Sequence, residues 1–199
     1  MKLITETIES VKYLTEASEN GKKCLYIEGP FLVAEQGNRN RRMYRLNTLK
    51  REVDRYNEEF IKTKRALGEL GHPDTPTINL ERVSHLITEL RQEGNTFIGK
   101  AKILDTPYGQ IVKNFIDNGV NLGVSSRGMG GDPVYSGGSV YVPEDYNMIC
   151  YDAVTNPSVH NAILQRAFQE EVYMLQQATK YKRNAWEVLI DLKQKYGVK

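Results

Sequence analysis

The alternation of apolar and polar residues divides the chain into short strands and a few helices. Residues 24–36 are rich in strand-forming residues and are interrupted only by Gly29 and Pro30. Asn47 is expected to cap a helix over 47–60, in which apolar residues recur every three or four positions: Leu49, Val53, Tyr56 and Phe60. The pattern therefore begins with a strand that is followed by a helix.

The following segments add a hairpin, a second helix and more strands. Residues 82–104 predict a β-hairpin with its turn at "QEGN". A second helix is expected after Thr106, which suits the N-cap, with Pro107 in the first turn. Residues 121–126 predict a strand that runs into a glycine loop, and two short strands follow before a helical pattern closes the chain. Because neighbouring strands are joined by short turns, we predict an α+β fold with a mostly antiparallel sheet.

Charge and composition divide the chain into three parts. Residues 1–22 are rich in charges and end in "SENGKK", so we expect a flexible leader there. Residues 23–165 contain the main domain, and 166–199 form a C-terminal helical extension. Hydrophobic residues make up 40% of the chain and the net charge is +2, as in ordinary globular proteins. No apolar run approaches the roughly 20 residues needed to cross a bilayer, so no membrane partner is expected.

A serine becomes a nucleophile only when a base takes its proton, and that base is usually a histidine oriented by a carboxylate. The chain has three histidines. His72 precedes Pro73, which favours an extended conformation that displays the imidazole. A turn histidine that bonds only to the backbone is the alternative, and the local sequence alone favours it. His85 fits a structural histidine in a strand, and His160 fits a residue at the start of a helix.

Two adjacent serines in "GVSSRGMG" are the candidate nucleophiles. Successive side chains of a strand point to opposite faces, so Ser125 and Ser126 cannot both face one site. Ser125 shares its face with Gly123, which leaves room for a substrate carbonyl and favours Ser125. We place Ser126, Arg127 and Gly128 in the oxyanion or substrate-binding region, since glycines permit backbone angles that direct N–H groups at an oxyanion. A plain Gly/Ser loop is the alternative, with Arg127 as a surface charge or an ion-pair partner.

Asp152 is the candidate for the orienting carboxylate. Its neighbours in "MICYDAV" are apolar, and a carboxylate buried among them is costly unless it is paired. Two interpretations stay open: Asp152 faces solvent from a strand, or it orients the histidine.

Four motifs, "NRNRRMY", "ALGELGHP", "GVSSRGMG" and "YDAVTNPS", resemble in order and spacing the prohead core protein proteases of tailed phages. These are serine peptidases of capsid maturation, related to the herpesvirus maturation protease. The resemblance covers roughly residues 24–165 and implies a barrel-like β core with surrounding helices. It matches His72 with the catalytic histidine, Ser125 with the nucleophile and Asp152 with the third member. The herpesvirus relatives use a second histidine there, which keeps His85 and His160 as candidates.

The resemblance also implies a task. Such a protease acts inside the prohead, within the host cytoplasm, on scaffold or core proteins, on the major capsid protein and on itself. It cuts after glutamate in an aliphatic-x-Glu context. Two such triplets lie in the leader and end at Glu6 and Glu16, of which Glu16 is the preferred self-cleavage site, while a third, ending at Glu89, lies in a predicted strand. We expect no metal and no organic cofactor, and the sequence is compatible with a homo-oligomer.

A non-catalytic module that keeps this fold and binds scaffold or nucleic acid is the competing interpretation. The segment "NRNRRMYR" clusters four arginines around Tyr44, a pattern that suits phosphate groups. The net charge of +2 is modest for a nucleic-acid-binding protein, which argues against nucleic acid as a partner.

Overall fold

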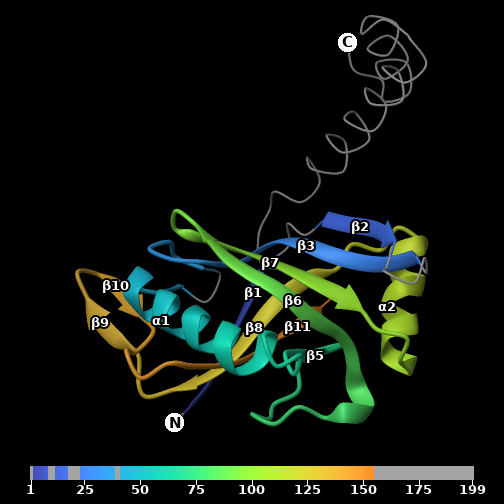
Figure 1. Ribbon diagram of the computed structural model, residues 1–199. Coiled ribbons are helices and arrows are strands. Elements are labelled where there is room, and N and C mark those ends of the chain that lie inside the picture. The colour runs from blue at the N-terminus through green and yellow to red at the C-terminus, as the bar shows by residue number, and fades with distance from the viewer. Residues whose placement is uncertain (1, 9–11, 18–22, 39–40, 155–199) are drawn as a thin grey trace, which may run out of the picture. The chain divides into compact units, whose positions relative to one another are not determined.

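The computed structural model describes residues 2–8, 12–17, 23–38 and 41–154 (Figure 1). Within these residues the chain forms eleven strands, two α-helices and two short helical turns. The strands are β1 (Lys2–Ile8), β2 (Lys12–Ala17), β3 (Lys23–Val33), β4 (Arg42–Met43), β5 (Leu67–Glu69), β6 (Val83–Glu93), β7 (Thr96–Ile103), β8 (Gly123–Gly130), β9 (Val134–Ser136), β10 (Ser139–Tyr141) and β11 (Asn147–Val154). The helices are α1 (Leu46–Tyr56), continued by a π-helical turn (Asn57–Ile61), and α2 (Pro107–Asp117), and a 3₁₀ turn (Leu80–Arg82) precedes β6.

The described strands form three sheets that are mostly antiparallel. One has five strands in the order β2-β3-β7-β6-β5, another has the order β1-β8-β11, and a small third sheet has the order β4-β10-β9. The predicted α+β class is confirmed, but the expected barrel-like closure is wrong. Among the described residues, one isolated bridge between Leu70 and Ala153 connects the two larger sheets and no ladder does, so the sheets do not close into a barrel. No helix within the described ranges is long and apolar enough to cross a membrane.

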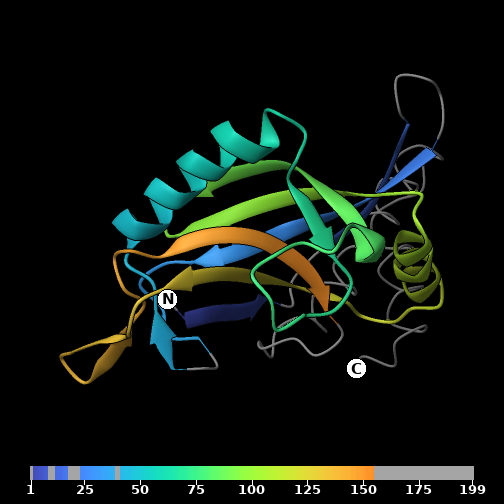
Figure 2. The same cartoon turned by 90° about the horizontal axis from the view of Figure 1, so that it is seen from below.

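A hydrophobic core joins the two larger sheets and α1. Figure 2 shows β11, β8 and β1 as a second sheet beside the five-stranded one, with α1 across one face. Phe31 of β3 and Tyr151 of β11 bring their ring centroids within 5.1 Å, and the Tyr56 ring of α1 lies 5.9 Å from Tyr151. All three side chains are fully buried. This packing fixes β11 and its neighbour β8, the strands that carry Asp152 and Ser125.

Turn and capping signals located several elements correctly. The hairpin of β6 and β7 is present with its turn at Gly94, and Thr106 caps α2 by accepting a hydrogen bond from the Gly109 amide at 3.1 Å. The expected cap at Asn47 is wrong, because α1 begins at Leu46 and its N-cap is Arg45, two residues earlier. There the Leu46 amide donates to Glu35 Oε1 at 2.7 Å, so a distant carboxylate replaces the local cap.

The structure differs from the prediction of a flexible leader. Residues 2–8 form β1, which pairs with β8, and residues 12–17 form β2, which pairs with β3. The β-branched residues of "ITETI" favour a strand, and burial of Ile4 in the core anchors it, which together outweigh the polarity that suggested a loose segment. The C-terminal extension, predicted over 166–199, lies outside the described residues.

Gly68 of β5 is expected to tolerate no side chain. A Cβ atom there would lie 2.1 Å from the Tyr151 carbonyl oxygen and 2.2 Å from His85 Nε2, two atoms that contact each other at 2.9 Å. Gly68→Ala should therefore lower the free energy of unfolding by about 2–4 kcal/mol, through overpacking and the loss of this buried hydrogen bond. Urea denaturation measures the change. Gly37→Ala is the matched control, because the space around Gly37 is open, and equal stability of the two variants would contradict the prediction.

Candidate active site

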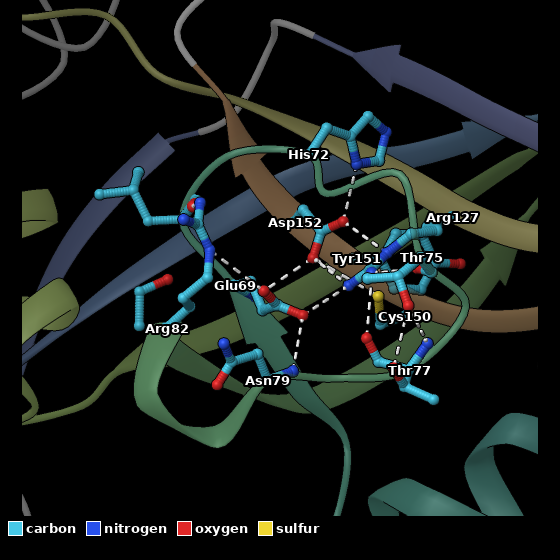
Figure 3. A network of polar contacts seen from close by, with 12 residues as sticks. Glu69, His72, Thr75, Thr77, Asn79, Arg82, Arg127, Cys150, Tyr151 and Asp152 are labelled. Carbon is cyan, nitrogen blue, oxygen red and sulfur yellow. Dashed lines mark hydrogen bonds and ion pairs between the residues drawn. The ribbon is translucent and has the colours of Figure 1, made fainter.

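Ser125, His72 and Asp152 come together from three separate segments. Ser125 lies on β8 directly opposite Asp152 on β11, and His72 lies in the loop after β5. Ser125 Oγ is 2.8 Å from His72 Nε2, and His72 Nδ1 is 2.7 Å from Asp152 Oδ2. Figure 3 shows the imidazole of His72 above the Asp152 carboxylate. These three residues therefore form one continuous hydrogen-bonded chain.

Gly71 brings His72 to this position. Its φ of +83° is readily adopted by glycine and turns the chain sharply after β5. The Gly71 amide donates to the Ala153 carbonyl oxygen at 2.7 Å, which fixes the loop next to Asp152. The motif "GHP" therefore combines a turn residue with a displayed imidazole.

This hydrogen-bonded chain suits proton removal from Ser125. An ionised Asp152 accepts the Nδ1 proton of His72, which leaves the lone pair of Nε2 toward the Ser125 hydroxyl. The imidazole is partly exposed, whereas the serine and the carboxylate are fully buried. Such an arrangement can generate a serine nucleophile at the edge of solvent.

Asp152 is held ionised by several donors. Its Oδ1 accepts hydrogen bonds from the Glu69 amide at 3.1 Å, from Arg127 Nη2 at 3.2 Å and from the Cys150 thiol at 3.4 Å. Burial by itself raises the pKa of Asp152, but the hydrogen bond from His72 and the charge of Arg127 outweigh burial, so the pKa lies below its ordinary value. The Asp152 carboxylate is therefore charged at neutral pH, which it must be if it orients His72.

Arg127 lies beneath the site and is fully buried. Its guanidinium pairs with Glu69 Oε1 at 3.0 Å and with Asp152 Oδ2 at 3.0 Å. Burial lowers the pKa of Arg127, but Cys150 and Asp152 raise it to a net value above the ordinary one. The buried position of Arg127 favours the role of an ion-pair partner over that of a surface charge or of a group that contacts substrate.

The Arg127 side chain also fixes the loop that carries His72. Its Nη1 donates to the carbonyl oxygens of Thr75 and Thr77 at 2.6 and 3.4 Å (Figure 3). Glu69 Oε1 accepts in addition from the Asn79 amide at 3.0 Å. One buried ion-pair cluster thus connects the His72 loop to the strand with Asp152. Sequence reasoning missed Glu69, although a carboxylate within the short apolar segment "ALGELG" was a usable signal.

Ser126 and Gly128 lie within β8, beyond Ser125. Ser126 follows Ser125 on the same strand and is fully buried, and no hydrogen-bond partner of its Oγ lies among the described residues. The expected glycine loop is wrong, because β8 continues through Gly130. A Cβ on Gly128 would lie 2.4 Å from the Tyr146 ring, so close packing explains this glycine.

Of the other two histidines, the structure describes only His85, and His85 does not contact Ser125 or His72. His85 is fully buried, with Nε2 2.9 Å from the Tyr151 carbonyl oxygen and Nδ1 2.8 Å from Ser84 Oγ. Burial lowers the pKa of His85 below its ordinary value, against the opposing effect of the Asp152 charge. His85 is a structural histidine, and His160 lies outside the described residues. No group of three or more potential metal ligands occurs in the ranges that the structure describes.

Comparison with known proteins assigns the chain to a family. Residues 4–171 match the family of the prohead core protein serine proteases. The chain belongs to this family. The prohead core protein protease of Enterobacteria phage T4 is 36% identical over 145 residues, which cover 71% of this chain and 68% of that protein. The solved structure of the bacteriophage T4 capsid assembly protease matches with a TM-score of 0.73 and 32% identity, covering 78% of this chain and 98% of that one.

Asp152→Asn tests the orienting group of this prohead protease. Asparagine cannot accept the His72 Nδ1 proton as a charged group, so the imidazole loses the correct tautomer, and kcat/KM should fall about 10⁴-fold. That loss should be smaller than the about 10⁶-fold expected for replacing the serine or the histidine. Peptidase kinetics measure it, with Asp54→Asn on the exposed side of α1 as the control. Unchanged kinetics in Asp152→Asn would remove this residue from the mechanism.

Proposed function

We propose that this prohead protease is an endopeptidase in which Ser125 is the nucleophile and His72 the general base, with Asp152 orienting His72. The observation that carries the proposal is the position of His72, whose Nε2 lies 2.8 Å from Ser125 Oγ and whose Nδ1 lies 2.7 Å from Asp152 Oδ2. Ser125 Oγ attacks the scissile carbonyl carbon while its proton passes to His72 Nε2. His72 then protonates the leaving amine, and water hydrolyses the acyl-enzyme in the second half of the reaction.

The substrates that we propose are the scaffold or core proteins and the major capsid protein of the prohead, together with the chain itself. The names of the relatives, a prohead core protein protease and a capsid assembly protease, support this choice. The enzyme would then work in the prohead interior, within the host cytoplasm. The proposed catalytic domain spans 23–165, with 166–199 as an appended helical extension.

The cleavage context that we propose is an aliphatic residue, any residue and then glutamate. The triplets that end at Glu6 and Glu16 provide two such sequences within the chain. Paired peptides that differ only by glutamate or glutamine at the cleaved position test the preference. The glutamate peptide should be cleaved with a kcat/KM roughly ten- to a hundredfold higher, since only a carboxylate would satisfy a charged site. Equal rates for the two peptides would refute the glutamate specificity, and Ser125→Ala should cleave neither.

A further inference from the structure

Three arginines that precede α1 lie outside the candidate active site. Arg41 and Arg45 are exposed and Arg42 is half-buried, and none of them forms an ion pair with a carboxylate among the described residues. Within α1 the situation differs, since Arg55 pairs with Glu52 at 2.9 Å. The basic segment before α1 therefore presents positive charge that the described part of the chain does not neutralise by pairing.

The carboxylates close to these arginines are bonded to other groups. Glu35 and Asp145 accept hydrogen bonds from backbone amides, at 2.7 and 2.9 Å, and Asp132 forms an ion pair with Lys2. The guanidinium groups before α1 are thus available to carboxylates from another molecule or segment.

Arg45 stacks on an aromatic side chain of the small sheet. The central carbon of its guanidinium lies 4.3 Å from the centre of the Tyr141 ring. Stacking uses the flat face of a guanidinium and leaves the N–H groups at its rim, where they can bond to a carboxylate in the same plane. Tyr141 therefore holds Arg45 in one orientation at the surface.

The small sheet exposes apolar side chains beside Arg45. Its β9–β10 hairpin projects at the lower left of Figure 2. The pairing of β10 with β9 and β4 places Val134 and Met43 on either side of Tyr141, and paired residues share a face of a sheet. Val134 is 46% exposed, and Tyr135 on the other face is 79% exposed. Apolar side chains open to this degree are suited to a partner.

β9 is also an edge strand. β10 pairs with one side of it, and no strand of the described chain pairs with the other side. The backbone N–H and C=O groups of such an edge can pair with an extended polypeptide. β9 spans only Val134–Ser136, so the edge accommodates a short segment.

This region lies at a distance from the nucleophile. β8 continues from Ser125 to Gly130, and the five residues of strand span roughly 17 Å before the chain reaches β9. A peptide that only fills the active site cannot reach so far. A longer polypeptide can, if roughly five or more extended residues separate the two regions.

We propose that the protease has a second substrate-binding region here, which binds an acidic, extended segment of the polypeptide away from the cleaved bond. We call it the β9 surface, and it consists of Arg41, Arg42, Arg45, Val134, Tyr135 and Tyr141. The arginines bind carboxylates, the apolar side chains contact the residues between them, and the outer edge of β9 pairs with the backbone. This inference rests on the proposed function, because it takes the bound segment as part of a substrate.

The chemistry of the β9 surface favours a polypeptide over a nucleic acid. Arginines beside aromatic rings also suit single-stranded nucleic acid, which binds mainly through base stacking and phosphate contacts. The open strand edge and the aliphatic side chain of Val134 add features that an extended polypeptide uses and that base stacking does not.

Binding to the full-length Ser125→Ala chain tests the β9 surface without turnover. The probe is a fluorescent peptide of alternating aspartate and valine, and its control has asparagine in place of aspartate. Fluorescence anisotropy should give a Kd about tenfold lower for the aspartate peptide. Adding Arg41→Gln, Arg42→Gln and Arg45→Gln together should abolish this difference.

A second triple variant controls for the loss of net charge. Lys62→Gln, Lys64→Gln and Arg91→Gln remove the same charge from other exposed positions and should keep the difference in Kd. Equal Kd values for the two peptides, or equal losses in the two triple variants, would overturn the inference. A triple arginine variant that loses affinity for a single-stranded DNA oligonucleotide but not for the aspartate peptide would assign the surface to nucleic acid instead.

Peptidase kinetics of the full-length chain connect the β9 surface to catalysis. A short peptide carries only the cleaved sequence, and two long peptides add a spacer of roughly eight residues and the aspartate–valine segment, before or after that sequence. At least one long peptide should have a KM about tenfold below that of the short one, with equal kcat. The triple arginine variant should bring the ratio of the two KM values to about one.

The two levels of the proposal fail in different ways. A KM ratio that is the same in the wild type and in the triple arginine variant would overturn the β9 surface as a substrate-binding region and leave the proposed function standing. Failure of the proposed function would appear as the absence of Ser125-dependent cleavage of any peptide, short or long. The anisotropy measurement does not depend on that outcome, because it uses the Ser125→Ala chain.

Discussion

Ser125→Ala is expected to lower kcat by about 10⁶-fold, to the level that binding and oxyanion stabilisation alone provide. The reason is that Ser125 Oγ, 2.8 Å from His72 Nε2, is the atom that would form the covalent bond to substrate. Kinetics on a peptide substrate measure the loss. His72→Ala should cost about as much, because the two residues act as one unit.

Ser126→Ala is the matched control for this prediction. Ser126 is the same residue type on the same strand and equally buried, but its side chain occupies the opposite face of β8. It should keep most of the activity, since its side chain lies on the face of β8 opposite to that of Ser125. Full activity in Ser125→Ala together with none in Ser126→Ala would reverse the assignment of the nucleophile.

Arg127→Met is expected to cause the largest loss of stability, about 3–5 kcal/mol at neutral pH. The substitution leaves the buried carboxylates of Glu69 and Asp152 without the guanidinium that lies 3.0 Å from each. It also frees the carbonyl oxygens of Thr75 and Thr77, which hold the His72 loop. The free energy of unfolding from urea titration measures the loss.

The pH dependence of this loss identifies its origin. In the wild type the pKa of Asp152 lies below its ordinary value, so the ion pair contributes stability above the unfolded pKa of about 3.9 and loses it as the pH falls through the folded pKa. The difference between Arg127→Met and the wild type should therefore be largest near neutral pH and shrink in acid. Arg91→Met, which removes exposed ion pairs, should cost at most about 1 kcal/mol. A pH-independent loss in Arg127→Met would indicate altered packing instead.

Local sequence signals predicted the elements whose causes are themselves local. The turn at Gly94 and the cap at Thr106 are determined by nearby residues, and both are observed. The start of α1 was misjudged because its capping carboxylate, Glu35, lies eleven residues before the amide it accepts from. The sheets do not close because one bridge, between Leu70 and Ala153, connects β11 to the segment after β5, and no periodicity within either segment encodes this.

In the candidate site, too, features with local causes could be predicted and features with long-range causes could not. The period of two along a strand was enough to separate Ser125 from Ser126. The three histidines kept the search for a base short, but the family resemblance and not the local sequence selected His72. The role of Arg127 could not be predicted, because its burial depends on Glu69 and Asp152, which are distant in sequence. The position of β1 beside the nucleophile was equally hidden, since strand pairing across the whole chain leaves no local signal.

Labelling the purified chain with a fluorophosphonate, and locating the adduct by peptide mass spectrometry, tests directly whether His72 activates Ser125. Such a reagent bonds to a serine oxygen only where a base activates it. We expect a single stoichiometric adduct on Ser125, with none on Ser126 and none in His72→Ala. An adduct on another serine, or labelling of Ser125 that persists without His72, would contradict it.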